Sequence, residues 1–145
     1  MNVKSTVEFS SNFGDIIKQY SYAQSFHFFK KCFLLVSQNN ILFVENYEEW
    51  LDHFGKRMQD VAVKFGHFIP AIQEFKDIKN KILYKDKDGL AVVIALKYTY
   101  NLYEVLGKRK SGINYIMKVF KLIINNNIEN ENLLTLFYMI REIMA

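Results

Sequence analysis

Residues 89–106, with the sequence GLAVVIALKYTYNLYEVL, decide the fold. Their few polar side chains recur at helical spacing and form one narrow stripe. These are Lys97, Asn101 and Glu104, with Thr99 lying off the stripe. A helix that is apolar on most of its surface must be covered by neighbouring elements. We therefore predict a central helix over residues 89–106, with Asp88 as its cap and Gly107 as its C-terminal stop.

The segment that follows is predicted to form an amphipathic helix over residues 112–126. Its apolar side chains fall at intervals of three and four residues and share one face. They are Ile113, Ile116, Met117, Phe120, Ile123 and Ile124. Ser111 precedes the helix and is a suitable N-cap, because its hydroxyl can accept a hydrogen bond from the first turn. A last helix is expected from about residue 131 to the end, capped by Asn130.

Two further helices are indicated in the middle of the chain. One begins near Asn46, and its apolar stripe comprises Trp50, Phe54, Met58, Val61, Phe65 and Phe68. Pro70 is expected at the first position of the next helix, where a missing N–H group costs nothing. The buried face of that helix is predicted to comprise Ile72, Phe75, Ile78 and Ile82.

The N-terminal third allows two interpretations. Ser11 or Asn12 can cap a helix from residue 13, which a second stripe continues as far as Val36. The apolar runs at residues 33–36 and 41–44 are also typical of a β-hairpin, as is the region 82–94. The predicted fold class is all-α, a bundle of five to seven helices around the central helix. The alternative is α+β, with one or two hairpins over residues 33–44 and 82–94.

Length and composition indicate one folded domain over residues 1–145. The chain has one proline, six glycines, no repeat and no linker, and half of its residues are hydrophobic. The single Cys32 excludes an internal disulfide and fits a reducing compartment. Residues 1–13 lack a signal-peptide core, and the longest apolar run, residues 90–96, is too short to span a bilayer. We predict a cytoplasmic protein, or one in the cytosol of a host cell, without membrane insertion.

No pattern of catalytic or metal-binding residues is present. Cys32 lies in a strongly apolar stretch, which is typical of a buried thiol. The three histidines, His27, His53 and His67, lack the spacing that builds a metal site on a helix. The carboxylates near Asn46 are explained by the dipole at a helix N-terminus. We therefore predict a non-enzymatic protein without a cofactor or a metal ion.

The most distinctive polar feature is a basic region near the C-terminal third. Three consecutive cations precede a predicted helix N-terminus, and two lysines continue along the exposed side of that helix. The candidate anion or nucleic-acid contacts are Lys108, Arg109, Lys110, Ser111, Lys118 and Lys121. Free N–H groups and adjacent cations favour bound phosphate. Nucleic-acid binding through residues 108–121 is therefore one functional hypothesis.

The chain is also unusually rich in aromatic residues for a domain of its size. The chain has 13 Phe, 9 Tyr and one Trp, more rings than a domain of this size hides easily. Tyr98, Tyr100 and Tyr103 on the central helix are candidate interface residues. The leading hypothesis is a protein–protein interaction protein, adaptor or inhibitor-like, whose apolar and aromatic surface binds a protein partner or a second copy of itself.

Overall fold

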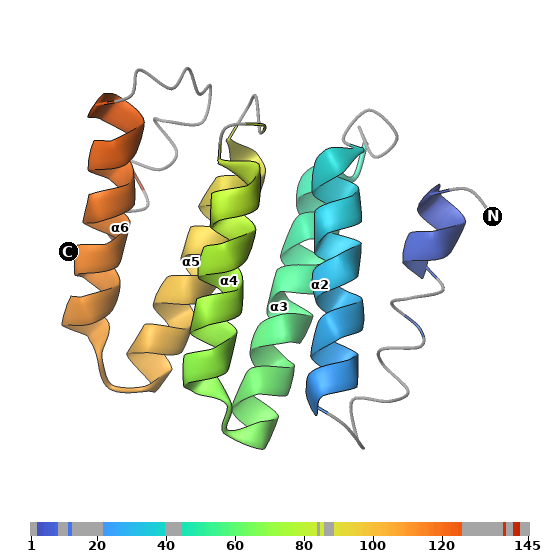
Figure 1. Cartoon of the computed structure of the whole chain (residues 1–145), viewed down its shortest axis with the longest axis horizontal. Coiled ribbons are helices and arrows are strands. Elements are labelled where there is room, and N and C mark those ends of the chain that lie inside the picture. The colour runs from blue at the N-terminus through green and yellow to red at the C-terminus, as the bar shows by residue number, and fades with distance from the viewer. Residues whose placement is uncertain are drawn as a thin grey trace. The chain divides into compact units, whose positions relative to one another are not determined.

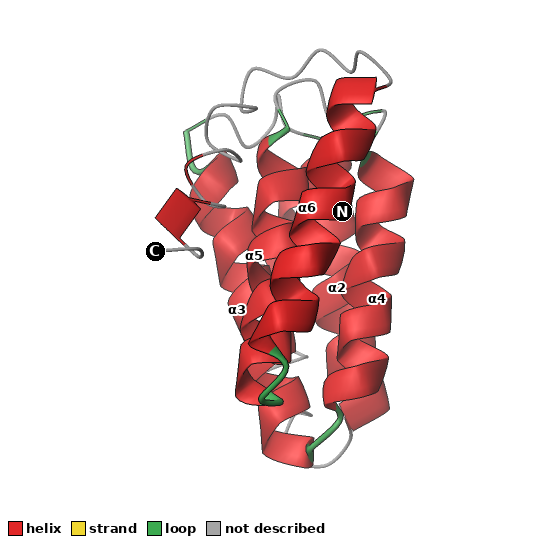
Figure 2. Cartoon of the chain, turned by 90° about the vertical axis from the view of Figure 1, so that its left-hand side faces the viewer, coloured by secondary structure: helices red, strands yellow, loops and turns green. Residues whose placement is uncertain are grey.

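The computed structural model describes residues 3–8, 12, 22–39, 45–83, 85, 89–125, 138 and 141–142. Its helices are α2 (Tyr22–Gln38), α3 (Tyr47–Phe65), α4 (Phe68–Ile82), α5 (Leu90–Val105) and α6 (Arg109–Asn125) (Figure 1). Residues 3–8 are also helical. The described residues contain no strand, as Figure 2 shows. The prediction of an all-α fold is confirmed.

The described parts of the two candidate hairpin segments contain helix and no strand. Residues 33–36 lie inside α2, and residues 82 and 90 belong to the end of α4 and the start of α5. Phe33 and Val36 share the buried face of α2 with Phe26 and Phe29, so a helix already buries this apolar run. Several predictions fall outside the described residues: the helix over residues 13–21, the strand at residues 41–44, the Asp88 cap and the Asn130 cap with most of its helix.

The chain divides into two compact units, Met1–His67 and Phe68–Ala145. In the first unit α2 packs against α3. Its core holds fully buried large side chains from both helices: Phe29, Phe33, Leu51, Phe54 and Met58. Cys32 is buried among them, and its Sγ donates to the carbonyl oxygen of Val7 at 3.6 Å. This burial agrees with an unreactive thiol.

In the second unit α5 contacts both α4 and α6. Ten of its sixteen residues are buried, as the nearly all-round apolar pattern predicts. The ring of Tyr98 stacks on Phe75 of α4, with 6.0 Å between the centroids. Inside α5, the hydroxyl of Thr99 donates to the carbonyl oxygen of Ala95 at 2.8 Å, which satisfies this buried polar group. The helix predicted over residues 89–106 is therefore confirmed within one residue at each end.

Two glycines with a left-handed backbone conformation lie just after the C-terminal ends of α3 and α5. Gly66 has φ 68° and Gly107 has φ 80°. The N–H of His67 donates to Ala62 O at 2.9 Å, and the N–H of Lys108 donates to Tyr103 O at 2.8 Å. These bonds close the last turns of α3 and α5, as in a Schellman motif. The predicted stop at Gly107 is confirmed.

We expect substitutions of Gly66 and Gly107 to act through backbone conformation alone. A Cβ at either position meets nothing within 4 Å, so no steric term opposes a side chain. Gly→Ala should lower the free energy of unfolding by about 1 kcal/mol, Gly→Val by more, and Gly→Asn by less. Urea unfolding of each variant measures this order. Equal losses for Ala, Val and Asn would contradict it.

The starts of α4 and α6 differ from the prediction. Phe68 begins α4 rather than extending α3, and Pro70 is its third residue, still in the turn whose N–H groups have no helical acceptor. α6 begins at Arg109, and the N–H of Gly112 donates to Lys108 O at 3.1 Å. Ser111 therefore lies within the first turn instead of capping the helix.

The buried face of α6 is also rotated from the predicted stripe. It comprises Gly112, Ile116, Val119 and Ile123, whereas Ile124 is 48% exposed. The reason is a close approach at Gly112. A Cβ on this residue would lie 3.0 Å from Tyr100 Cδ2 and 3.0 Å from Tyr103 Cβ on α5. The absence of a side chain lets the two helices approach each other here and sets the face that α6 turns inward.

Gly112→Val should therefore destabilise the second unit. The added side chain must displace the ring of Tyr100 and the Cβ of Tyr103 on α5, at a cost of about 1–3 kcal/mol in the free energy of unfolding. Ser111→Val is the matched control, because it places the same residue at an exposed position in the same turn. Chemical denaturation measures both variants. A loss of the same size for Ser111→Val would show that helix propensity, and not the close approach, is responsible.

Candidate functional site

The outer side of α6 carries a basic face, which we define as Lys108, Lys110, Lys118 and Lys121. All four side chains are exposed. At 3.6 residues per turn, the three that belong to α6 lie opposite the buried face around Gly112 and Ile116. α6 contains four basic residues and no acidic residue. No carboxylate in this helix therefore neutralises the basic face.

The N-terminus of α6 strengthens this positive potential. Lys108, Arg109 and Lys110 lie at the end of the helix where the dipole is already positive and where acidic residues are normally preferred. Arg109 is exposed, and its Nε donates to the hydroxyl of Tyr100 at 3.0 Å. Ser111 is exposed beside them in the first turn. The structure thus brings all six predicted basic-region residues onto one helix and the residue before it.

The net charge of the chain is distributed unequally between its two compact units. The unit Met1–His67 has seven basic and seven acidic residues, whereas the unit Phe68–Ala145 has twelve basic and eight acidic residues. The formal excess of +4 therefore belongs entirely to the second unit, which contains α6. Attraction of a polyanion is expected to act on this unit, and to weaken as salt screens it.

The predicted interface tyrosines are placed differently from the basic residues. Tyr98 is 3% exposed and Tyr100 is 7% exposed, so both rings are part of the core. Tyr103 is half-buried, and its hydroxyl accepts a hydrogen bond from Lys76 Nζ at 2.7 Å. The physical reason is that α5 has neighbours on two sides and turns its tyrosines toward them. The large exposed apolar side chains among the described residues of this unit are Ile69, Val105, Leu122, Ile124 and Tyr138.

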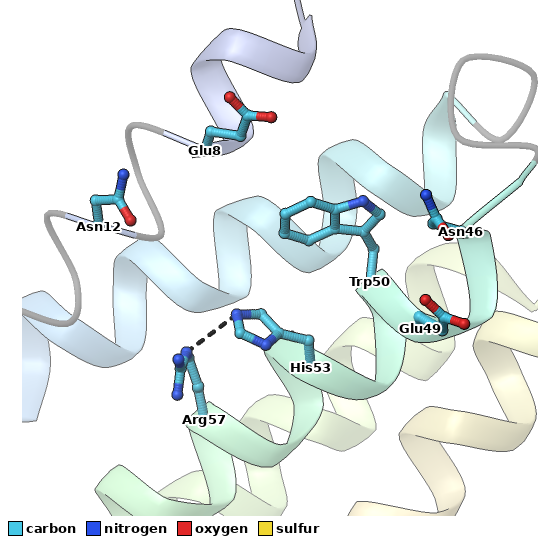
Figure 3. Close-up of a pocket in the computed structure, with 7 residues that line it drawn as sticks. All are labelled: Glu8, Asn12, Asn46, Glu49, Trp50, His53 and Arg57. Atoms are coloured by element: carbon cyan, nitrogen blue, oxygen red, sulfur yellow. Dashed lines mark hydrogen bonds between the residues drawn. The ribbon is translucent and has the colours of Figure 1, made fainter.

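The first unit contains a cleft of about 600 Å³ that the sequence analysis did not identify. Its lining residues are Glu8, Asn12, Asn46, Glu49, Trp50, His53 and Arg57 (Figure 3). The residues from α3 face Glu8 and Asn12 across the opening. Arg57 Nε donates to His53 Nε2 at 3.1 Å, and the indole of Trp50 stacks on the buried ring of Phe54.

The cleft can accept a small polar molecule, but the described groups that line it do not form a catalytic arrangement. His53 Nε2 already accepts a hydrogen bond, so it must release Arg57 before it can accept a proton from a substrate. Among the described residues, the lining contains no serine, cysteine or threonine that could act as a nucleophile. The part of the cleft on α3 has a helical spacing, with Glu49, His53 and Arg57 four residues apart. Only tertiary structure brings Glu8 and Asn12 to it.

The remaining candidate residues lie apart from one another. His67 is exposed and stacks on Tyr22, with 4.4 Å between the ring centroids. His27 is exposed on α2 beside Phe28. Within the described ranges, no three His, Cys, Asp or Glu side chains gather closely enough to hold a metal ion. None of the described helices combines the length and the hydropathy needed to cross a membrane.

Comparisons of the chain with protein-family models, with curated proteins and with solved structures gave no match. No relative therefore suggests an activity, a substrate or a partner. Two surfaces of the chain are candidates for a functional role, the basic face of α6 and the cleft of the first unit. The basic face is the stronger candidate of the two, because all of its exposed groups carry a positive charge.

Proposed function

We propose that this chain is a non-enzymatic nucleic-acid-binding protein whose basic face on α6 contacts the phosphate backbone. The observation that supports the proposal is the exposed, like-charged face of a helix that contains no carboxylate. Lysines act on phosphate as point charges, so such contacts position a protein without reading the base sequence. Weak, sequence-independent binding is the expected result.

The shape of the face suits a duplex backbone better than an unpaired strand. From Lys110 to Lys121 the helix advances about 17 Å at 1.5 Å per residue. A strand of duplex DNA places a phosphate about every 3.4 Å along its axis, so the lysines span several phosphates. Binding of single strands usually needs exposed aromatic rings on which bases stack. Tyr115 and Phe120, the aromatic residues of α6, are half-buried.

The salt dependence of binding tests the proposal quantitatively. We expect a 20-base-pair duplex, followed by fluorescence anisotropy, to bind with a slope of log affinity against log salt of about −3 to −4. Lys118→Ala with Lys121→Ala should remove about two contacts and make the slope less steep by about 2. The loss should be the same for duplexes of different sequence.

The matched control is Lys56→Ala with Lys64→Ala on α3. It removes two exposed lysines from the unit that has no net charge. We expect its salt slope to equal that of the unchanged protein. A slope that falls equally in both double variants would attribute binding to total charge, and absence of duplex binding at low salt would disprove the proposal.

A protein partner is the second candidate, and a specific observation favours it. Leu122 and Ile124 on α6 are 37% and 48% exposed, and Val105 at the end of α5 is 55% exposed. Large exposed apolar side chains are typical anchors of protein contacts, and Leu122 and Ile124, which are two residues apart, present such side chains on different sides of α6. An adaptor or inhibitor-like protein, or a homodimer, would use such residues.

A tagged pull-down from the native cell, divided into nuclease-treated and untreated halves, separates the two candidates. A stoichiometric protein that survives nuclease and is lost in Leu122→Ser with Ile124→Ser would support the partner hypothesis. Retention of nucleic acid in the untreated half, and loss of the accompanying proteins after nuclease, would support the binding of nucleic acid. Lys118→Ala with Lys121→Ala should abolish only the second behaviour.

A further inference from the structure

A second cluster of cations lies where α4, α5 and α6 of the second unit meet. Lys76 and Lys79 of α4 lie beside Tyr115 of α6, with their Nζ atoms 4.5 Å and 5.5 Å from the centroid of its ring. Lys76 Nζ also donates to the hydroxyl of Tyr103 on α5 at 2.7 Å. Three helices thus bring two ammonium groups and two phenols together.

The groups of this cluster are almost all hydrogen-bond donors. Lys79 is only 7% exposed, and its Nζ donates to Asn80 Oδ1 at 2.6 Å. Because Tyr103 accepts from Lys76, its own O–H proton points elsewhere and can donate. The hydroxyl of Tyr115 is buried and has no hydrogen-bond partner. Within the described part of the chain, neither lysine of the cluster has a carboxylate oxygen within 4 Å.

This arrangement is electrostatically unfavourable on its own. Burial, and then the charge of Lys76, lower the pKa of the Lys79 ammonium from its ordinary value. Burial raises the pKa of Tyr115, as do the neighbouring Tyr103 and Asp77, so its hydroxyl keeps its proton. The ring face of Tyr115 compensates the ammonium charges only in part. Buried donors without an acceptor normally destabilise a fold.

We propose that Lys76, Lys79, Tyr103 and Tyr115 bind a phosphate group, either as inorganic phosphate or as a phosphomonoester. A phosphate supplies a first acceptor for the Tyr115 hydroxyl, and charged acceptor oxygens for two ammonium groups whose present acceptors, Tyr103 and Asn80, are uncharged. Its tetrahedral oxygens can be shared among donors from three helices, whereas a carboxylate presents two oxygens in one plane. The proposal does not depend on nucleic-acid binding, because none of these residues belongs to the basic face.

Thermal unfolding of the full chain at constant ionic strength tests the site. The probes are inorganic phosphate and glycerol phosphate, with chloride and acetate as references. We expect the unfolding temperature to rise with phosphate concentration, more than in either reference, because a ligand of the folded state stabilises it. A rise with inorganic phosphate assigns the free anion, and a rise with glycerol phosphate alone assigns an organic phosphate. Each result supports the proposal.

The variants separate specific binding from a general salt effect. Lys79→Met should lose most of the phosphate-dependent rise, yet unfold at a higher temperature than the unchanged protein in chloride, because a desolvated cation has been removed. Tyr115→Phe keeps the ring, removes the unpartnered hydroxyl and should weaken phosphate binding several-fold. Lys81→Met is the control, since Lys81 is exposed on the same helix. An equal rise in all four proteins, or none in the unchanged protein, would overturn the proposal.

Discussion

The burial of α5 is the constraint on which the second unit depends. A helix that is apolar on nearly every side is stable only when neighbours cover it, and α4 and α6 supply that cover. The contact with α6 is set by Gly112, where a Cβ would lie only 3.0 Å from atoms of Tyr100 and Tyr103. Because this approach fixes which side of α6 faces inward, it also determines which side faces solvent.

The distribution of charge follows from that packing. Once Gly112, Ile116 and Val119 face α5, the lysines of α6 project outward, and the helix has no carboxylate to balance them. Lys76 and Lys79 of α4 are placed differently, because both lie beside the ring of Tyr115 and Lys79 is buried there. One unit therefore has two cationic sites of different character. The outer face suits an extended polyanion, and the enclosed cluster suits a single phosphate group.

Some helices and sites of this protein can be predicted from its sequence better than others. Helical periodicity and the position of Gly107 were sufficient for α5, because its polar side chains recur at helical spacing over a segment longer than a typical strand. They also predicted α6, but they placed its start three residues late and its buried face differently, because Gly112 resembles a helix boundary and is in fact a packing contact. The cleft at His53 and the cluster at Lys79 could not be predicted, since each joins residues that are distant in sequence and ordinary in composition.

The contact surface on α6 can be tested most directly by NMR. The amide signals of the 15N-labelled chain would be followed at low salt while a 20-base-pair DNA duplex is added. We predict that the largest shifts fall on residues 108–121, that they reverse as salt is raised, and that the amides of α3 around His53 remain unchanged. Shifts that concentrate on α3, or on the apolar residues of α5, would contradict the assignment of the basic face as the site of contact.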